Sequence, residues 1–185
     1  MRTYKRLRTE GGCYFFTVVL AQRHKNNLLI DHINTLRQSF KYAQVNHPFV
    51  MDAVVIMPDH LHCIWQLPKN DYNFSTRWRL VKAHFSRSIN KSGNEVINTS
   101  RHRKGERGIW QRRFWEHLIR DEFDYANHVE YIHYNPVKHG YVDHVSDGKY
   151  SSFHHWVKQG LYPANWAAAD NIINLISVSI ESNNS

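Results

Sequence analysis

Cysteine is scarce in this chain, and long apolar runs are missing from it. Two cysteines, Cys13 and Cys63, occur in 185 residues, both within strand-like apolar segments. Such a pair cannot supply a disulfide framework and is typical of reduced cysteines packed inside a cytosolic protein. No window approaches the roughly 18 uncharged apolar residues that a membrane-spanning helix needs. Gly11 and Gly12 interrupt the N-terminus before any long apolar segment, so we also expect no export signal.

Acidic side chains are few relative to basic ones. The chain has 24 Lys and Arg against 16 Asp and Glu, which gives a formal net charge of +8. This balance favours a partner with many negative charges, nucleic acid first and an anionic membrane surface second, although many basic proteins bind neither. Six Trp and ten Tyr favour nucleic acid, because unpaired bases stack on aromatic rings. With 42% apolar residues, the chain can bury one sizeable core, which predicts one domain.

Hydrophobic periodicity divides the chain into strand and helix segments. Strands are predicted at residues 13–20, 49–57, 60–67 and 109–119. Helices are predicted at residues 28–43, from a cap at Ser75 or Thr76 to residue 86, and from a cap at Asp121 to Asn135-Pro136. This order matches the split β-α-β pattern. We therefore predict an α+β ferredoxin-like sandwich, with helices packed on one face of an antiparallel sheet, plus a C-terminal extension.

The outer segments differ in composition from the folded region. Residues 1–10 form a basic N-terminal arm, and residues 11–145 should form the principal domain. Within it, residues 92–108 are rich in Gly, Asn, Ser and basic side chains, which is typical of a mobile surface insertion. Residues 146–185 form the C-terminal extension. Its aromatic residues could wrap back over the sheet, residues 167–180 could form a terminal helix, and the last residues should fray.

His60 and His62, one residue apart, form the first candidate site. In a strand, the rings of both histidines would project from one face of the sheet, while Leu61 and Cys63 would point to the opposite face. Two aligned imidazoles can share a metal ion, although the same pattern also occurs on solvated strand faces. Because Cys63 points away from His60 and His62, it cannot join them in a zinc site. A site of two imidazoles and one amide oxygen suits Mg²⁺ or Mn²⁺ better.

The helix that approaches Pro136 carries the second candidate site. Asp124, His128, Tyr131 and Asn135 follow one another at spacings of four, three and four residues, so they share one stripe. A polar stripe on a helix usually faces water, and that interpretation stays open. A phenol beside a metal ion can instead attack a phosphodiester. Tyrosine ionises near pH 10, so it needs a polarised phosphate or a supporting base such as His128.

Three separated motifs carry a specific resemblance. They are Pro58-Asp59-His60-Leu61-His62, Arg113-Phe114-Trp115-Glu116-His117 and the run Tyr131-Ile132-His133-Tyr134-Asn135-Pro136-Val137-Lys138-His139-Gly140. In this order they resemble the REP-associated tyrosine transposases, which are single-tyrosine members of the HUH nuclease superfamily. The similarity extends from residue 11 to residue 166 and weakens in the 92–108 insertion.

The resemblance implies a role for each matching residue. His60 and His62 would bind the divalent ion, Tyr131 would be the nucleophile, and Asn135 would take the place of a third polar metal ligand. Tyr134 and Tyr125 are rival nucleophiles on the same helix at positions that do not match.

The resemblance also implies a reaction and a substrate. The reaction is metal-dependent cleavage and transfer of single-stranded DNA at REP hairpins through a 5′-phosphotyrosine intermediate, in the bacterial cytoplasm and at the nucleoid. Related enzymes are dimers whose partner supplies the tyrosine helix, so a monomer or a homodimer is expected. Basic side chains would add affinity for the DNA backbone, and the candidates are Arg79, Lys82, Arg112, Arg113 and Lys138.

Three other functions stay open at this point. A non-catalytic hairpin-binding protein derived from a transposase would keep the basic surface, but intact His60, His62 and Tyr131 speak against it. A replication-initiator or relaxase-type nickase shares the chemistry, yet the small size and the lack of a helicase-like segment disfavour it. A metal hydrolase acting on small phosphoesters would not need Tyr131.

Overall fold

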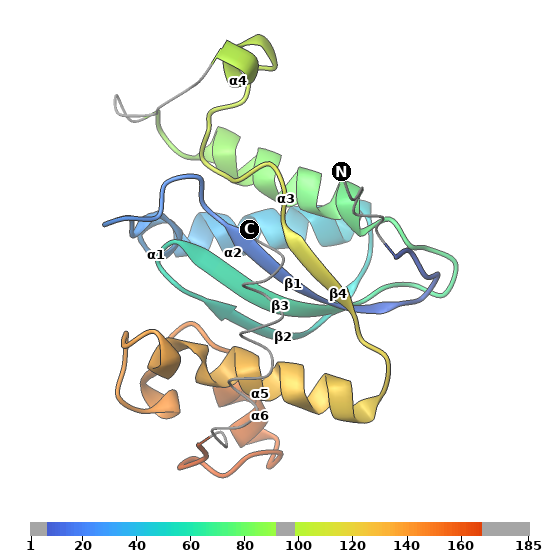
Figure 1. Cartoon of the computed structure of the whole chain (residues 1–185), viewed down its shortest axis with the longest axis vertical. Helices are drawn as coiled ribbons and strands as arrows, with labels where there is room; N and C mark the ends of the chain where they lie inside the picture. Colours follow the sequence, from blue (N-terminus) through green and yellow to red (C-terminus); the bar gives the residue numbers. More distant parts are fainter. Residues whose placement is uncertain (1–6, 92–98, 168–185) are drawn as a thin grey trace, which may run out of the picture.

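A four-stranded antiparallel sheet forms the centre of the molecule (Figure 1). The computed structural model describes residues 7–91 and 99–167, so the start of the basic arm, residues 92–98 and the expected helix beyond residue 167 lie outside it. The strands are β1 (Cys13–Val19), β2 (Val50–Ile56), β3 (His60–Gln66) and β4 (Trp115–Leu118), and they lie in the order β2-β3-β1-β4. Every neighbouring pair is antiparallel, which is the sheet of the predicted ferredoxin-like fold.

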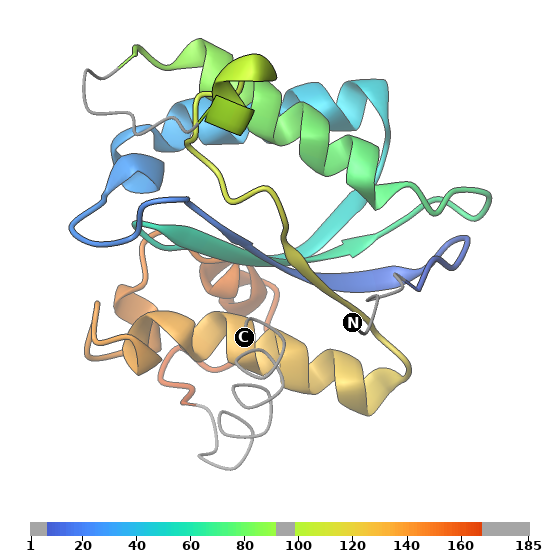
Figure 2. The ribbon, with the colours of Figure 1, turned by 45° about the horizontal axis from the view of Figure 1, so that its top comes forward.

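Helices cover both faces of the sheet rather than one, which corrects the expected layering. Helices α2 and α3 lie on one face, and α5 lies on the other face together with α6 (Figure 2). The physical reason is that β1 and β3 carry large apolar side chains on both faces, Phe16 and Trp65 on one and Phe15 and Ile64 on the other, so each face needs a cover. The helices are α1 (Leu28–Asp31), α2 (Ile33–Asn46), α3 (Phe74–Ser88), α4 (Thr99–Arg103), α5 (Glu122–Lys138), the 3-10 turn η1 (Val145–Asp147) and α6 (Phe153–Lys158).

Strand alternation divides the core into two clusters. The cluster under α2 and α3 contains Tyr14, Phe16, Leu61, Cys63, Trp65 and Trp78. The cluster under α5 contains Phe15, Ile64, Val129 and Ile132. The expectation that Leu61 and Cys63 face away from His60 and His62 is therefore confirmed. The two histidines lie on the α5 face.

The ends of α3 and α5 differ from the predicted ones. Asn73 caps α3 by accepting a hydrogen bond from the backbone N–H of Thr76 at 3.1 Å, so the helix begins before the expected caps at Ser75 or Thr76. Asp121 caps α5 as predicted, and its side chain accepts from the Asp124 N–H at 2.8 Å. Helix α5 then continues through Pro136 to Lys138. A proline so close to a helix end disrupts little, and the helix closes instead on Gly140, whose φ is +66°.

The described part of the insertion is tied to the fold. Residues 99–103 form α4, where the composition had suggested a mobile segment. The side chain of Arg107 donates hydrogen bonds to the carbonyls of Ile89 and Asn90, at 2.6 and 2.8 Å, and also to Ser86. A single guanidinium with several donors can thus anchor a Gly-rich segment to the end of α3.

The C-terminal extension wraps back over β2 as expected. The indole N–H of Trp156 donates to the carbonyl of Asp52 at 3.2 Å, and the Ser152 hydroxyl accepts from the Val54 N–H at 2.9 Å. Among the described residues, no helix has the length and apolarity needed to cross a bilayer.

Candidate active site

Strand β3 presents His60 and His62 on the face that α5 covers. Its backbone pairs with β1 on one side and β2 on the other, so both histidines stand on a strand that is held along both edges. The centroids of the two rings lie 5.2 Å apart, and the ring planes are almost perpendicular. A rigid central strand holds such a pair in fixed geometry, which is what a metal site requires.

Each histidine has one ring nitrogen occupied by a protein partner. Nδ1 of His60 lies 2.6 Å from a carboxylate oxygen of Asp59, and Nδ1 of His62 lies 2.8 Å from the hydroxyl of Thr17. Both Nε2 atoms are therefore left to face the centre of the site. Metal-binding histidines are usually oriented in this way, by a carboxylate or another polar group on the second nitrogen.

Asp59 links His60 to the surface residue Arg23. The guanidinium of Arg23 donates to the second carboxylate oxygen of Asp59 at 2.6 Å. Burial raises the pKa of Asp59, but the hydrogen bonds and charges of His60 and Arg23 outweigh burial and hold that pKa below its usual range. Asp59 is therefore a carboxylate at neutral pH and can fix the orientation of the His60 ring.

His62 is an uncharged ring with an unused nitrogen. Burial, together with the nearby His60, His139 and Lys138, lowers the pKa of His62 well below its ordinary value. Its Nε2 is buried and has no hydrogen-bond partner. A buried ring nitrogen without a partner is rare in folded proteins and calls for an explanation such as an ion. A neutral imidazole is also the form that coordinates metals.

Helix α5 brings Tyr131 and Asn135 to the same place. The centroid of the Tyr131 ring lies 5.3 Å from that of His62 and 6.0 Å from that of Phe15. Asn135, one helical turn later, is fully buried and lies close enough to His62 to favour its protonated form. Neither the oxygen nor the nitrogen of its side-chain amide makes a hydrogen bond of accepted geometry. The polar stripe on α5 therefore faces the sheet and not the solvent.

These donors fit a hard divalent cation. Two imidazole nitrogens and one amide oxygen lie on two neighbouring elements, and two of the three residues carry buried polar atoms without partners. An Asn oxygen and ring nitrogens suit Mn²⁺ or Mg²⁺. The remaining coordination positions would be open to phosphate oxygens and water.

The site is closed to solvent in this conformation. Tyr131 is 4% exposed, and His60, His62 and Asn135 are buried as well. His139, in the segment after α5, lies over His60 with 5.1 Å between ring centroids. DNA can reach the Tyr131 hydroxyl only if α5 or the segment that follows it moves.

The rival tyrosines have other surroundings. Tyr125 hydrogen-bonds Asp52 on β2, near the end of the sheet opposite His60. Burial, and next the charge of Asp52, raise the pKa of Tyr125. Tyr134 is half-buried on α5 and has no ring contact with His60 or His62. Of the three tyrosines on α5, it is Tyr131 whose ring contacts His62.

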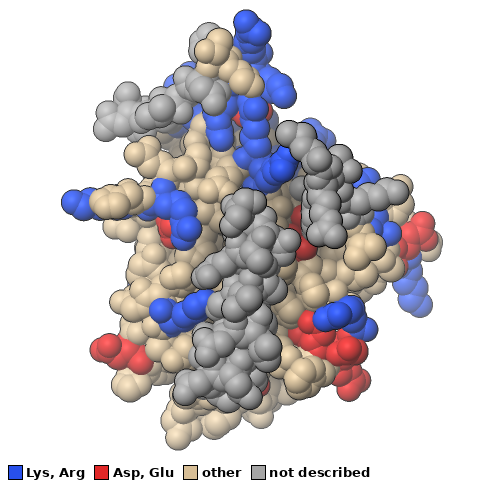
Figure 3. All heavy atoms as spheres, viewed as in Figure 1, with Lys and Arg blue, Asp and Glu red and all other residues tan. Residues whose placement is uncertain are grey.

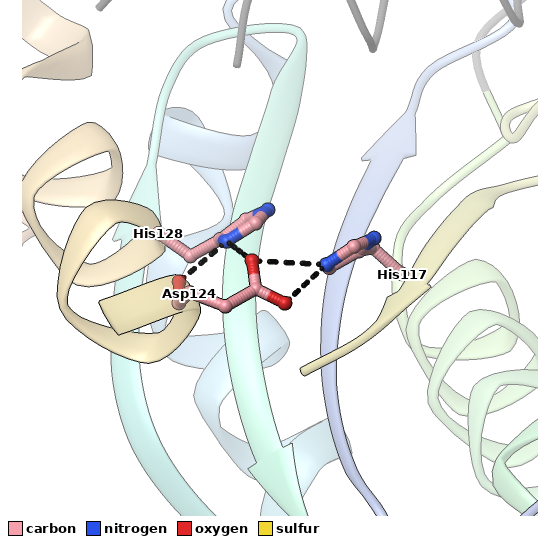
Figure 4. Close-up of side chains that lie close together, drawn as sticks. All are labelled: His117, Asp124 and His128. Atoms are coloured by element: carbon pink, nitrogen blue, oxygen red, sulfur yellow. Dashed lines mark hydrogen bonds and ion pairs between the residues drawn. The ribbon is translucent and has the colours of Figure 1, made fainter. Parts of the chain in front are cut away.

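A second polar cluster joins β4 to α5 (Figure 4). Asp124 accepts from Nε2 of His117 at 2.8 Å and lies 3.0 Å from Nδ1 of His128, whose ring stacks on that of His117 at 4.6 Å. The three side chains lie close enough together to hold a metal ion. The hydrogen bonds already pair the atoms involved, so the cluster can equally act as a clamp between the two elements.

His128 is separated from Tyr131. Its ring packs on Phe15 at 4.8 Å, and Phe15 in turn contacts Tyr131. Burial is the main reason that the pKa of His128 falls to about 4. The contacts of His128 indicate support of Phe15 rather than direct proton transfer from Tyr131.

The five basic candidates lie in three places. Lys138 lies beside Tyr131, with its ammonium 5.2 Å from the centre of the ring. Arg79, Lys82 and Arg112 line a cavity beside α3, on the other face of the sheet. Arg113 is exposed in the segment before β4.

Sequence reasoning missed Thr17 and Asp59 as partners of the histidines. Asp59 could have been found, because it directly precedes His60 and carboxylates commonly orient metal-binding histidines. Thr17 could not, because its place opposite His62 depends on the register between β1 and β3.

Several known proteins are similar to this chain. Residues 12–135 match the family model described as "Transposase IS200 like". The chain is 44% identical over 167 residues to the REP-associated tyrosine transposase of Escherichia coli, covering 90% of this chain and 92% of the relative. It is 50% identical over 166 residues to a Haemophilus influenzae protein assigned to the same group, covering 90% of this chain and 93% of the relative.

A solved structure is similar over nearly the whole chain. It is a REP-associated tyrosine transposase bound to a REP hairpin, 43% identical in sequence, with a TM-score of 0.77. The match covers 91% of this chain and 93% of the other.

Proposed function

The chain belongs to the REP-associated tyrosine transposases of the IS200-like family, and from that membership we propose that it cleaves and rejoins single-stranded DNA at REP-type hairpins. The observation that carries the proposal is the contact between Tyr131 and the His60–His62 pair within one chain. The hairpin-bound structure of the relative supports the choice of substrate.

Tyr131 is the proposed nucleophile. Its hydroxyl oxygen forms a bond to the scissile phosphorus, the bond from phosphorus to the 3′ oxygen breaks, and the 5′ phosphate stays on the tyrosine. The phenol loses its proton, and the departing 3′ oxygen gains one, so the step is balanced. The ammonium of Lys138 lies 5.2 Å from the centre of the Tyr131 ring and adds positive charge beside the attacking residue.

The metal ligands would be His60, His62 and Asn135. A divalent ion bound there would polarise the scissile phosphate and offset its developing charge. Asp59 and Thr17 would hold the two rings so that Nε2 of each faces the phosphate. Attack by a 3′-hydroxyl on the phosphotyrosine reverses the chemistry and gives strand transfer without an external energy source.

The tyrosine and the histidines come from the same chain. A dimer is therefore not needed to complete the site, and we propose a monomer as the active species. A chromosomal hairpin as substrate would place the chain in the bacterial cytoplasm.

A labelled hairpin tests the proposed function. The protein is incubated with Mn²⁺ and an end-labelled single-stranded REP hairpin, and covalent adducts are resolved on a denaturing gel. We expect an adduct with the wild type and with the matched control Tyr125→Phe, and none with Tyr131→Phe or His60→Ala. Hairpin binding without any adduct would favour a non-catalytic DNA-binding protein instead.

A further inference from the structure

The buried candidate site has an exposed rim beside His60. The rim is formed by Arg23, from the loop that follows β1, and by His139 and Tyr141, from the segment after α5. The Arg23 side chain is 54% exposed and Tyr141 is 48% exposed, whereas His60 is buried. Lys and Arg side chains are visible over the loop after β1, at the left of Figure 3, and over α4 at its top. A phosphate that approaches His60 from solvent therefore meets a cation at this rim.

Asp59 fixes Arg23 at the rim. One oxygen of its carboxylate lies 2.6 Å from Nδ1 of His60, and the other accepts a hydrogen bond from Nε of Arg23, also at 2.6 Å. The backbone carbonyl of Asp59 accepts from the N–H of Leu20 at 2.8 Å, which ties the start of the Arg23 loop to the same place. A single carboxylate therefore separates the guanidinium from a proposed metal ligand.

The terminal nitrogens of Arg23 are left for another acceptor. Within residues 7–91 and 99–167, the side chain of Arg23 makes its hydrogen bond to Asp59 alone, and it does so through Nε. A guanidinium carries further N–H donors on both terminal nitrogens. The fully buried Arg77 shows the opposite case, because its donors reach the carbonyls of Pro48 and Asn73 as well as Asp71. Arg23 thus keeps donors that a purely structural arginine uses within the fold.

The guanidinium lies on the solvent side of His60. The ring of His139 covers His60 with 5.1 Å between the ring centroids. Burial first, and then the charges of His60, Lys138 and Arg23, lower the pKa of His139 to about 4, so Arg23 is close to that covering ring. Tyr141 of the same segment hydrogen-bonds Asp59. When this segment moves to admit DNA, Arg23 stays beside the opening, because its anchor is Asp59 and not the segment.

The proposed reaction needs positive charge at this place. When a phenol attacks a phosphodiester, negative charge must be stabilised on the nonbridging oxygens of the phosphate. A divalent ion bound at His60 and His62 would contact one of these oxygens, and the other would still need a partner. A guanidinium keeps its charge at physiological pH and forms strong, directed hydrogen bonds to phosphate oxygens. Arg23 supplies such a group at the His60 side of the site.

We propose that Arg23 is a further catalytic residue, whose terminal N–H groups bind a nonbridging oxygen of the scissile phosphate while its Nε stays on Asp59. The inference rests on the proposed function, because its ligand is the phosphate that Tyr131 attacks. Arg23 forms and breaks no covalent bond in this role. The competing role is support alone, in which Arg23 fixes Asp59 and acts on His60 only through that carboxylate.

Single-turnover formation of the covalent adduct separates the two roles. The wild type, Arg23→Gln and Arg23→Lys are compared at saturating Mn²⁺ and saturating hairpin. The matched control is Lys25→Gln, which removes an exposed charge from the same loop and should react like the wild type. The rate in Arg23→Gln should fall about 100-fold, the loss typical of one missing donor to the transition state. Arg23→Lys keeps the charge without the forked geometry and should lose less.

Phosphorothioate hairpins locate the contact. Sulfur replaces one nonbridging oxygen of the scissile phosphate, and the two diastereomers are assayed separately. Sulfur accepts hydrogen bonds weakly, so the diastereomer with sulfur toward Arg23 has already lost most of the contact. For that diastereomer the loss in Arg23→Gln should be well below the loss seen with the normal phosphate. For the other diastereomer the two losses should be equal, which completes a double-mutant cycle between Arg23 and one oxygen.

Three results would overturn the proposal. They are a wild-type rate in Arg23→Gln, an equal loss with the normal phosphate and with both diastereomers, and a loss that disappears as Mn²⁺ is raised. The last result would assign Arg23 to support of the metal ligands through Asp59. Failure of the wild type to form any adduct would instead contradict the proposed function itself.

Discussion

The hydroxyl of Thr17 on β1 lies 2.8 Å from Nδ1 of His62 on β3, and this contact leaves Nε2 of the ring for the proposed metal ion. Replacement of Thr17 by Val removes the oxygen and keeps the shape of the side chain. We expect Mn²⁺ affinity, measured by calorimetry in the absence of DNA, to fall about 10- to 100-fold. Thr17→Ser keeps the hydroxyl and should bind Mn²⁺ like the wild type. Unchanged affinity in Thr17→Val would show that this contact does not orient the ring.

Asp124 should act as a clamp between β4 and α5. Asp124→Asn replaces the carboxylate that accepts from His117 and should lower the free energy of unfolding by about 1–3 kcal/mol. Chemical denaturation measures the loss. Because His117 and Asp124 share one interaction, adding His117→Gln to Asp124→Asn should lower the free energy of unfolding little further. Fully additive losses of unfolding free energy would contradict the clamp.

Asp71 should contribute to stability in a pH-dependent way. Its pKa is lowered chiefly by the hydrogen bond from the buried Arg77 at 2.8 Å. The stabilisation is therefore present above the ordinary carboxyl pKa and is lost as the pH falls through the lowered value. Asp71→Asn should be less stable than the wild type by on the order of 1 kcal/mol at pH 7, and the difference should vanish in strong acid.

Urea unfolding at a series of pH values measures this difference. Asp143→Asn, at an exposed position, serves as the control and should match the wild type throughout. A deficit of Asp71→Asn that persists unchanged below pH 3 would assign the effect to packing rather than charge.

Asp59, whose carboxylate contacts the His60 ring, gives a further prediction. Asp59→Asn keeps the size of the side chain but removes the charge that holds the His60 ring and pairs with Arg23. Mn²⁺ binding should weaken about tenfold or more, while Arg23→Gln, which removes the guanidinium that pairs with Asp59, should have a smaller effect. Equal losses in the two variants would indicate that Arg23 acts on the site directly.

Much of this architecture could be predicted from the sequence because its signals are local. Alternation placed His60 and His62 opposite Leu61 and Cys63, and the spacing on α5 placed Tyr131 and Asn135 on one stripe. The order of strands and helices gave the ferredoxin-like sheet, which the structure confirms.

Other features depend on contacts that no local pattern encodes. Arginine is ordinarily an exposed residue. Arg77 is nevertheless fully buried, because its donors reach the Pro48 and Asn73 carbonyls and Asp71. The second helical layer was missed for a related reason. The apolar side of α5 indicates that the helix packs, but not on which face of the sheet.

Peptide mapping of the covalent adduct tests the central claim most directly. No Lys or Arg occurs between Arg120 and Lys138, so one tryptic peptide carries Tyr125, Tyr131 and Tyr134 together, and fragmentation must locate the nucleotide within it. After reaction with the hairpin and Mn²⁺ and digestion of the DNA, we predict a phosphonucleotide on Tyr131. The same mass addition on Tyr125 or Tyr134 would contradict the assignment of the nucleophile.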